Sequence, residues 1–402
     1  MTKIDAVNRR AFLKTAGLGV GMGAGMLASL PSTAFGEGNI AYETIAPSQD
    51  IAPTATLNFA VCGMSHDHIY GMVSAIQRGG GKLVAWFGEE PDKIALFKSR
   101  YPNVKQVASE QAILDDPNIQ LVLSSTVASH RAQRGIRVMK HGKDYLSDKP
   151  GITTLADLAE IRKTITETKR IYAIMYSELL EVKGAIKAGE LVRAGAIGKV
   201  IQTINIAPHQ IEQGAVGDKF AGGASKRPDW FWEPELYGGI LTDIGSHQVE
   251  QFLYYTGSTS AEIVESQVAN INHPGHPKFQ DFGDMVLRGD KGFGYVRLDW
   301  FTPDGLGTWG DGRLFILGTQ GYIEVRKYTN VAVSKAGNNL FLVDKDSSRF
   351  IDCNNVPLPF GPAFVADVVN RTHNAQDQTQ ALLAAELVIK AQLAAKHVTI
   401  KA

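Results

Sequence analysis

The sequence predicts an α/β protein that begins with a doubly wound parallel sheet and continues into an α+β domain with a large, mostly antiparallel open sheet. Two patterns indicate this. From residue 57 to 177, short apolar runs alternate with segments of helical spacing. From 178 to 402, longer strand-like runs follow one another with turns between them. The 402 residues, 44% of them hydrophobic, are enough to build two cores of ordinary size.

The first 34 residues differ from the rest of the chain. The segment NRRAFLK at 8–14 is followed by a glycine-rich, weakly apolar run and a proline. This run is shorter than the ~20 apolar residues that span a bilayer, so residues 1–34 are predicted to be a cleavable export signal. Arg9 and Arg10, followed by Phe-Leu-Lys, resemble the twin-arginine type. We expect an exported, periplasmic protein without a membrane span in its mature form, with residues 35–56 as an extended arm or linker.

Charge and cysteine content narrow the partners and the chemistry. The chain has 41 basic and 41 acidic residues and no long basic run, which argues against a nucleic-acid partner. Its two cysteines are Cys62 and Cys353. Because Cys62 lies within an apolar strand pattern, we expect two buried free thiols rather than a disulfide, even in an oxidising compartment.

The elements of the first domain follow in regular alternation. The apolar strand runs are TLNFAVCG, KLVAWFG, LVLSSTV, DYLSDKP and IYAIMYS. The segments of helical spacing between them are HIYGMVSAIQRGG, EPDKIALFKSRYP, SHRAQRGIRVMKHG and TLADLAEIRKTITETK. This order predicts a Rossmann-like dinucleotide-binding domain over residues 57–177.

The second domain, residues 178–402, opens with a helical segment, VKGAIKAGELVRAG. Its strand runs are KVIQTINIA, AEIVESQVANI, DMVLRG, FGYVRLDWF, RLFILG, GYIEVRKY and NLFLVD. One helical insertion, GGILTDIGSHQVEQFLYYTG, interrupts these strands, and the helix TQALLAAELVIKAQLAAK closes the chain. We expect this domain to bind the substrate and to mediate oligomerisation.

The turn after the first strand, CGMSHDH at 62–68, keeps a single glycine. A dinucleotide site needs a tight turn at this point and a helix N-terminus aimed at the pyrophosphate. The glycine follows the strand directly, and a helix begins within a few residues. We predict that the turn contacts a nucleotide through Gly63, Met64, Ser65, His66 and His68.

Two other interpretations of this turn remain open. A His-x-His pair could chelate a metal, but a third or fourth ligand is needed. The other histidines are scattered, and no carboxylate–histidine cluster stands nearby in the sequence. A purely structural turn is the remaining alternative. Nucleotide contact is favoured, and no metal site is predicted.

The end of the second strand, AWFGEEP, bears on the choice of cofactor. In NAD-binding sites, an acidic residue at this position accepts a hydrogen bond from the adenosine ribose. Gly88 occupies the usual acidic position, and Glu89 and Glu90 follow it. No arginine stands there for a 2′-phosphate, so NAD is favoured and NADP is the alternative.

Two motifs in order carry a family resemblance. SDKPG places Asp148, Lys149 and Pro150 at the end of a predicted strand. About 90 residues later, GGILTDIGSHQVEQF carries Asp243 and His247 in the spacing G-G-x-x-x-D-x-G-x-H. Together, and with the surrounding pattern from residue 57 to 402, they resemble the Gfo/Idh/MocA oxidoreductases.

The resemblance implies roles for these residues. Lys149 would contact both cofactor and substrate, Lys149 and His247 would transfer protons, and Asp243 would orient the substrate or the two bases. The chemistry is consistent with this, because hydride transfer from a sugar C–H requires loss of the hydroxyl proton to a nearby base.

Two further segments supply candidate contacts. SSTVASH resembles the family's Thr-Pro-x-x-x-His stretch, with Val127 in place of proline, and implies nicotinamide-side contacts from Thr126 and His130. SKRPDWFWEPELYGG places Arg227 and Trp230 on a predicted loop, where they would suit a sugar or sugar acid. A structural loop that packs its tryptophans is an equal alternative.

The function that follows is an exported NAD(P)-dependent oxidoreductase acting on a carbohydrate, polyol or sugar acid. Free cofactor is scarce outside the cytoplasm, so we expect a tightly held cofactor that is recycled in place. An NAD-dependent glycoside hydrolase or lyase that oxidises its sugar transiently is the first alternative. A non-catalytic binding module is the second. The resemblance also implies a homo-oligomer, a dimer or tetramer, formed through the C-terminal sheet.

Overall fold

The computed structural model describes residues 40–47, 50–211, 227–332 and 336–400. The predicted export signal lies outside the described residues, as do parts of the predicted arm. None of the described helices combines the length and the apolar composition needed to cross a membrane.

The first domain is built on a six-stranded parallel sheet of order β4-β3-β2-β5-β6-β7. Its strands are β2 (Leu57–Cys62), β3 (Gly81–Phe87), β4 (Lys105–Gln106), β5 (Leu121–Ser124), β6 (Asp144–Asp148) and β7 (Tyr172–Met175). Its helices are α2 (His68–Arg78), α3 (Pro91–Arg100), α4 (Glu110–Leu114), α5 (Arg131–Lys140) and α6 (Leu155–Thr168). The predicted doubly wound domain is therefore confirmed, and β4 and α4 are too short to show a period in the sequence.

The strand order places the ligand crevice. The chain runs outward from β2 to β3 and β4, then returns to β5 on the other side of β2. Ligands of such sheets bind beyond the carboxyl ends of the strands at this switch point. At the end of β2, Gly63 adopts a left-handed conformation with φ +83°, which tightens the turn into α2.

The second domain carries a ten-stranded sheet of order β1-β15-β14-β13-β12-β8-β11-β10-β9-β16. Most neighbours are antiparallel, and the pairs β1–β15, β8–β11 and β9–β16 are parallel. The strands are β1 (Ala41–Thr44), β8 (Val200–Pro208), β9 (Ala261–Ala269), β10 (Phe282–Gly289), β11 (Phe293–Asp299), β12 (Arg313–Gly318), β13 (Gly321–Arg326), β14 (Asn339–Asp344), β15 (Ser348–Asp352) and β16 (Lys396–His397). The predicted large, mostly antiparallel sheet is confirmed.

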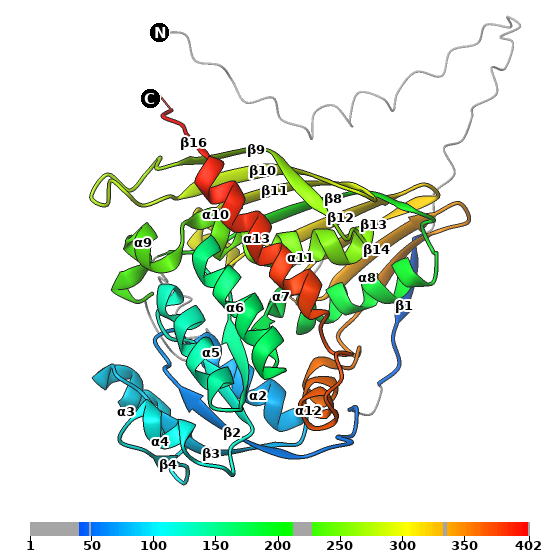
Figure 1. Cartoon of the computed structure of the whole chain (residues 1–402). Coiled ribbons are helices and arrows are strands. Elements are labelled where there is room, and N and C mark those ends of the chain that lie inside the picture. Colours follow the sequence, from blue (N-terminus) through cyan, green and yellow to red (C-terminus); the bar gives the residue numbers. More distant parts are fainter. Residues whose placement is uncertain (1–39, 48–49, 212–226, 333–335, 401–402) are drawn as a thin grey trace, which may run out of the picture. The chain divides into compact units, whose positions relative to one another are not determined.

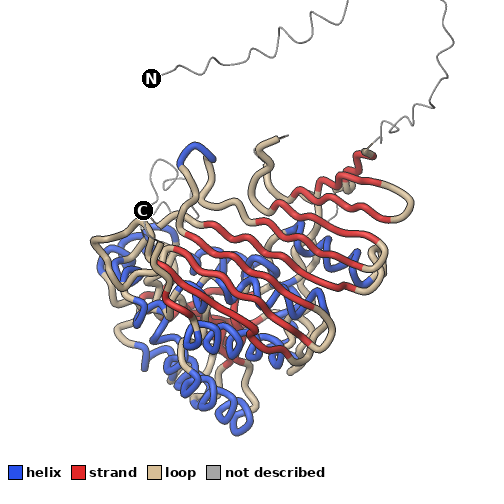
Figure 2. Tube along the Cα trace, turned by 90° about the horizontal axis from the view of Figure 1, so that it is seen from above, coloured by secondary structure: helices blue, strands red, loops and turns tan. Residues whose placement is uncertain are grey.

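Helices cover one face of this sheet. They include α8 (Lys183–Arg193), α10 (Ile240–Asp243), α11 (Gly245–Thr256) and α13 (Gln378–Ala394), which lie between the large sheet and the first domain (Figure 1). The opposite face of the strands is open in the view of Figure 2. Short helices α7 (Ser177–Leu180) and α9 (Pro234–Tyr237) complete the layer between the sheets.

Two segments tie the domains together. Strand β1, within the predicted arm, pairs with β15 at one edge of the large sheet. Helix α12 (Phe360–Asn370) packs on α2, and its Phe360 and Phe364 belong to the same buried cluster as the β2 and α2 side chains. The contact is close: a Cβ at Gly79 would lie 2.2 Å from the Gly361 carbonyl oxygen. Cys62 and Cys353 are buried free thiols, as predicted.

Candidate active site

Lys149 and Asp243 meet between the two domains. Lys149 directly follows β6, and its Nζ lies 2.9 Å from Oδ1 of Asp243 at the end of α10. Both side chains are only 2% exposed. A buried ion pair of this kind requires good geometry to offset its desolvation. The fold therefore brings the two sequence motifs, 94 positions apart, into direct contact.

Two atoms beside this pair have no hydrogen-bond partner among the described residues. They are Oδ2 of Asp243 and Nδ1 of His247, and both are buried. His247 lies in the first turn of α11, four residues after Asp243. Buried polar atoms are nearly always paired in native proteins, so these two mark a place where a bound molecule would supply the partner.

The electrostatics favour a neutral His247. Burial, followed by the charge of Lys149, holds its pKa well below the ordinary value. His209, just beyond β8, is affected in the same way: burial lowers its pKa most, and Lys149 and His247 act in the same direction. A neutral imidazole can accept a proton, so both histidines are competent bases at ordinary pH.

Arg227 and Trp230 pack beside this group. Arg227 donates from Nε to the Gln210 carbonyl at 3.0 Å, and its guanidinium carbon lies 4.6 Å from the centre of the Trp300 ring. Burial lowers the pKa of Arg227 to about 10. Trp230 stacks on Phe231 with ring centres 4.1 Å apart. Trp230 therefore packs on an aromatic neighbour and also lines, with Arg227, the cavity that contains Ser65 and Glu90, so its substrate contact stays a prediction. Arg227 also acts electrostatically on Asp243.

A second cluster lies at the glycine-poor turn. Nδ1 of His66 is 2.7 Å from Oδ2 of Asp148, and Nδ1 of His68 is 2.9 Å from Oδ1 of the same carboxylate. The two imidazole rings are 3.9 Å apart. Arg131 approaches Asp148 at 3.0 Å. Burial opposes ionisation of Asp148, but Arg131 and the two histidines hold its pKa well below the ordinary value.

The main chain fixes this turn. The His66 N–H donates to the Ser125 carbonyl at 3.0 Å, and the Ser125 hydroxyl donates to the His66 carbonyl at 2.6 Å. Behind the turn, a Cβ at Gly63 would lie 2.1 Å from Nη1 of Arg134. The space that a small residue leaves open is thus filled here by a buried arginine.

Ser65 and Glu90 line a cavity of about 340 Å³ beyond the carboxyl ends of β2 and β3. The Ser65 hydroxyl donates to Oε1 of Glu90, and Oε2 of Glu90 is buried without a partner among the described residues. Glu89 instead pairs with Arg134 at 3.1 Å, and 54% of its side chain is exposed. Glu90, rather than Glu89, therefore has an oxygen aimed at a ligand.

The remaining predicted cofactor contacts are Thr126, Met64 and His130, and the first two are buried whereas the third is exposed. Thr126 is buried against Gly63, and its carbonyl accepts a hydrogen bond from Arg131 at 2.7 Å. Met64 is buried and packs on Gly88. His130 is exposed at the end of the short helix η1 (Ala128–His130), where α5 begins, so the structure does not bring it to the cluster around Lys149.

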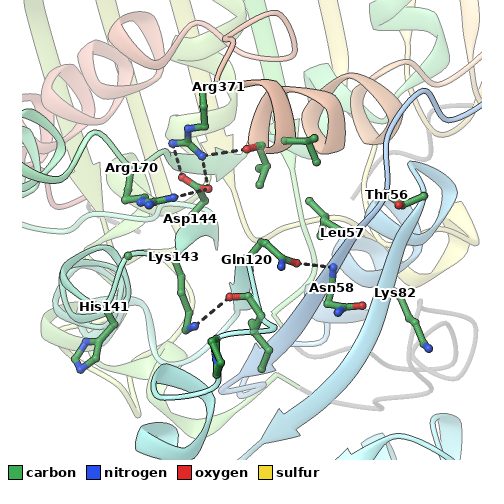
Figure 3. Close-up of a pocket in the computed structure, with 16 residues that line it drawn as sticks. Thr56, Leu57, Asn58, Lys82, Gln120, His141, Lys143, Asp144, Arg170 and Arg371 are labelled. Carbon is green, nitrogen blue, oxygen red and sulfur yellow. Dashed lines mark hydrogen bonds and ion pairs between the residues drawn. The ribbon is translucent and has the colours of Figure 1, made fainter.

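A larger cavity lies elsewhere. It measures about 860 Å³ and lies at the amino ends of the parallel strands (Figure 3). Two of its cationic side chains are already engaged: Arg371 pairs with Asp144 at 2.6 Å, and Lys143 donates to the Ile119 carbonyl at 3.0 Å. Because doubly wound sheets bind ligands at the opposite edge, we do not assign the active site there.

Comparison with known proteins agrees with this architecture. Residues 57–176 match the family model "Oxidoreductase family, NAD-binding Rossmann fold", and residues 185–324 match "GFO/IDH/MocA C-terminal domain". A putative oxidoreductase from Erwinia carotovora atroseptica of known structure is 43% identical, with a TM-score of 0.80, covering 85% of this chain and 100% of that one. The chain belongs to the Gfo/Idh/MocA oxidoreductase family.

More distant members of the Gfo/Idh/MocA family are similar over part of their length. D-xylose dehydrogenase of Paenarthrobacter nicotinovorans is 23% identical over 40% of this chain and 39% of its own. D-xylose 1-dehydrogenase (NADP+) of Hypocrea jecorina is 27% identical over 42% and 43%. The chain thus spans less than half the length of these two curated relatives. Levoglucosan dehydrogenase, solved with NADH, shares the fold at 16% identity and a TM-score of 0.67, over 84% of this chain and 96% of its own.

Residues 57–176 are therefore the family's NAD-binding Rossmann domain, and Glu90 in this domain fits NAD on the adenosine side. The unpartnered Oε2 of Glu90 can accept from ribose hydroxyls, as an acid at this strand end does in dinucleotide sites. The turn after β2 differs from a glycine-rich turn in two ways. Histidines stand where small residues are usual, and the side chains of Arg134 and Thr126 occupy the space beside Gly63.

Asp148 is the member of the second cluster, with His66 and His68, to which the sequence motifs assigned no role. The sequence placed it beside Lys149 in the SDKP motif, but nothing in the spacing linked it to residues 66 and 68. The link arises from the parallel pairing of β5 with β6, beside β2, which brings three strand ends to one edge of the sheet.

Proposed function

We propose that this protein transfers a hydride between NAD and a CH–OH group of a small carbohydrate, polyol or sugar acid bound against Lys149, Asp243 and His247. The observation that carries the proposal is the pair of unpartnered atoms, Oδ2 of Asp243 and Nδ1 of His247, beside a buried lysine. A hydroxylated substrate supplies both a donor for the carboxylate and a partner for the imidazole.

His247, Lys149 and Asp243 have different roles in the proposed reaction. His247, which its pKa keeps neutral, accepts the hydroxyl proton as the hydride leaves. Lys149 donates a hydrogen bond to the same substrate oxygen and stabilises the negative charge that develops on it, while Asp243 holds the ammonium group in place at 2.9 Å. Asp243 Oδ2 is then left to orient a neighbouring hydroxyl. Bound NAD supplies the hydride acceptor.

Substrate class is inferred from the relatives and the pocket. The relatives named above include dehydrogenases of D-xylose and levoglucosan. In this chain Arg227, buried and close enough to act on Asp243, adds a cation that suits the carboxylate of a sugar acid. A sugar or a sugar acid of similar size is the expected substrate.

Export through the twin-arginine route and an oligomer belong to the same proposal. The Arg9–Arg10 segment and the apolar run after it support export, which implies that the enzyme carries and recycles its cofactor. Four adjacent strands of the large sheet carry exposed apolar side chains, Ile201, Val264, Val286 and Phe293, and one face of these strands is open in Figure 2. Exposed apolar patches of this kind mark protein interfaces, which supports a homo-oligomer through this sheet.

The first test is to denature the purified mature protein and identify any released nicotinamide dinucleotide by absorbance and mass. We expect stoichiometric NAD, with NADP as a minor species at most. A protein that releases none and binds neither added nucleotide would overturn the proposal and favour a binding module.

A glycoside hydrolase or lyase with transient sugar oxidation is the second candidate. His209, a further neutral histidine electrostatically coupled to Lys149 and His247, favours it, because elimination and water addition need more acid–base groups than hydride transfer alone. Cleavage of glycosides without any change in bulk NADH would identify this activity.

A further inference from the structure

We propose that His66, His68 and Asp148 form a binding site for one divalent transition metal, with Zn²⁺ the first candidate. The three side chains can each contribute a ligand atom such that all of these atoms lie within 4.8 Å of one another. The sequence supplied two imidazoles at i and i+2, and the fold adds the carboxylate from a strand 80 positions away. Two histidines and one carboxylate are a recurrent ligand set of metal sites that keep an open position.

The geometry suits chelation. One carboxylate oxygen faces each histidine, at 2.7 Å for His66 and 2.9 Å for His68, and the rings stand 3.9 Å apart. A metal drawn between these groups replaces the two Nδ1–carboxylate hydrogen bonds with three coordinate bonds. The shift required is small because both imidazoles already converge on the same group.

Burial is graded across the site. The Asp148 side chain is fully buried, that of His66 is 5% exposed, and that of His68 is 27% exposed. Two ligands are thus held by the protein interior, and the third lies at the opening. This leaves the metal coordination positions that an oxygen donor entering the crevice, from a sugar or a phosphate, can occupy.

Groups around the ligands hold them in place, as is usual for metal sites. Arg131 contacts Asp148 at 3.0 Å and also donates to the Thr126 carbonyl at 2.7 Å. The His66 backbone is fixed through both its N–H and its carbonyl by Ser125. Phe231 packs edge-on against the His66 ring at 5.3 Å. The ligands are therefore oriented before any metal arrives.

The contact with Arg131 also supports a competing explanation, in which His66, His68 and Asp148 form a hydrogen-bond network without a metal. The charge of Arg131 already balances that of Asp148, so two histidines donating to a carboxylate form a complete hydrogen-bond network without a metal. The two explanations differ in one measurable respect: only the first requires stoichiometric, tight binding of a transition metal.

The experiment measures metal directly, without reference to turnover or to NAD. Full-length mature protein is dialysed against chelator and then metal-free buffer, titrated with ZnCl₂ by calorimetry, and analysed for bound metal by mass spectrometry. We expect one Zn²⁺ per chain, and visible d–d absorption when Co²⁺ replaces it. His68→Gln, which changes the most exposed ligand, is expected to weaken binding at least 100-fold.

His273→Gln is the matched control. Nδ1 of His273 lies 2.8 Å from the buried Asp281, which repeats the histidine–carboxylate contact without a second imidazole. This variant is expected to bind Zn²⁺ as the unmodified protein does. Equal Zn²⁺ binding by the unmodified protein and His68→Gln, or binding only at millimolar metal, would overturn the proposal and leave the hydrogen-bond network or an adventitious ion only. Because NAD release is measured separately, failure here and failure of the oxidoreductase proposal can be told apart.

Discussion

Two buried lysine–carboxylate pairs lie close together, and they differ in the polar atoms left around them. Lys149 and Asp243 are 2.9 Å apart, and Lys327 and Glu178 are 2.6 Å apart, all with side chains no more than 3% exposed. Oε2 of Glu178 accepts a second hydrogen bond, from Gln248 at 2.9 Å. Oδ2 of Asp243 accepts none from the described residues.

The difference separates a scaffold from a reacting site. Desolvation costs both pairs similarly, since their burial is alike. Lys327 and Gln248 both donate to Oε2 of Glu178, and neither oxygen of this carboxylate is among the buried atoms without a partner in the described residues. Although burial opposes its ionisation, Lys327 keeps the pKa of Glu178 below the ordinary value. This pair fastens α7 to the end of β13. Oδ2 of Asp243 accepts no hydrogen bond from the described residues. Since buried polar atoms are nearly always paired, we expect a bound ligand to donate to it. A buried charge alone therefore does not identify a catalytic group, and an unpaired carboxylate oxygen beside a buried lysine, as at Asp243, is the stronger indication.

The largest expected effect comes from the pair with unpaired atoms. Lys149→Met keeps the length of the side chain and removes its charge and its donor. We expect turnover to fall by about 10²- to 10⁴-fold, the range for loss of a positioned acid–base group. Steady-state kinetics on the true substrate, with circular dichroism to verify folding, measures this. Undiminished turnover would show that Lys149 is not a catalytic residue.

The same substitution in the other pair gives the matched comparison. Lys327→Met leaves Glu178 buried without its cation, which costs about 3–5 kcal/mol of the free energy of unfolding. Urea denaturation measures this loss, and turnover per folded molecule is expected to stay within a few-fold of the original. If Lys327→Met instead abolished turnover in a fully folded protein, the two pairs would not differ in kind, and Lys327 would belong to the site.

The sequence predicted the elements of this comparison unevenly. Strand and helix periods, together with two ordered motifs, were sufficient to predict both domains and to group Lys149, Asp243 and His247. Glu178 and Lys327 carry no motif, and only the packing of α7 against the end of β13 shows that they meet. Asp148 was visible in SDKP, but its contact with His66 and His68 depends on strand order, which periodicity does not encode. His130 was carried over from the resemblance alone, and the fold leaves it exposed.

A third buried carboxylate, Glu250 of α11, extends the comparison because no lysine or arginine of the described residues pairs with it. Burial raises its pKa to about 8, and the neutral side chain of Gln380 donates to its Oε1 at 3.2 Å. Glu250 therefore binds a proton more tightly in the folded state than in the unfolded chain, so its contribution to stability is most favourable below about pH 4.5 and is lost as pH rises from about 4.5 to about 8. We expect Glu250→Gln, which mimics the protonated form, to change stability little at pH 5.

At pH 8.5 the same variant should raise the free energy of unfolding, by an amount on the order of 1–3 kcal/mol after allowance for relaxation around the charge. Urea denaturation at both pH values measures the difference. Glu262→Gln on β9, where the side chain is 59% exposed, is the control and should show no such pH dependence. If Glu250→Gln were equally stabilising at both pH values, Glu250 would already be ionised at pH 5. A buried carboxylate could then stay ionised without a neighbouring lysine. The Lys149–Asp243 and Lys327–Glu178 pairs would then differ only in the unpaired Oδ2 of Asp243.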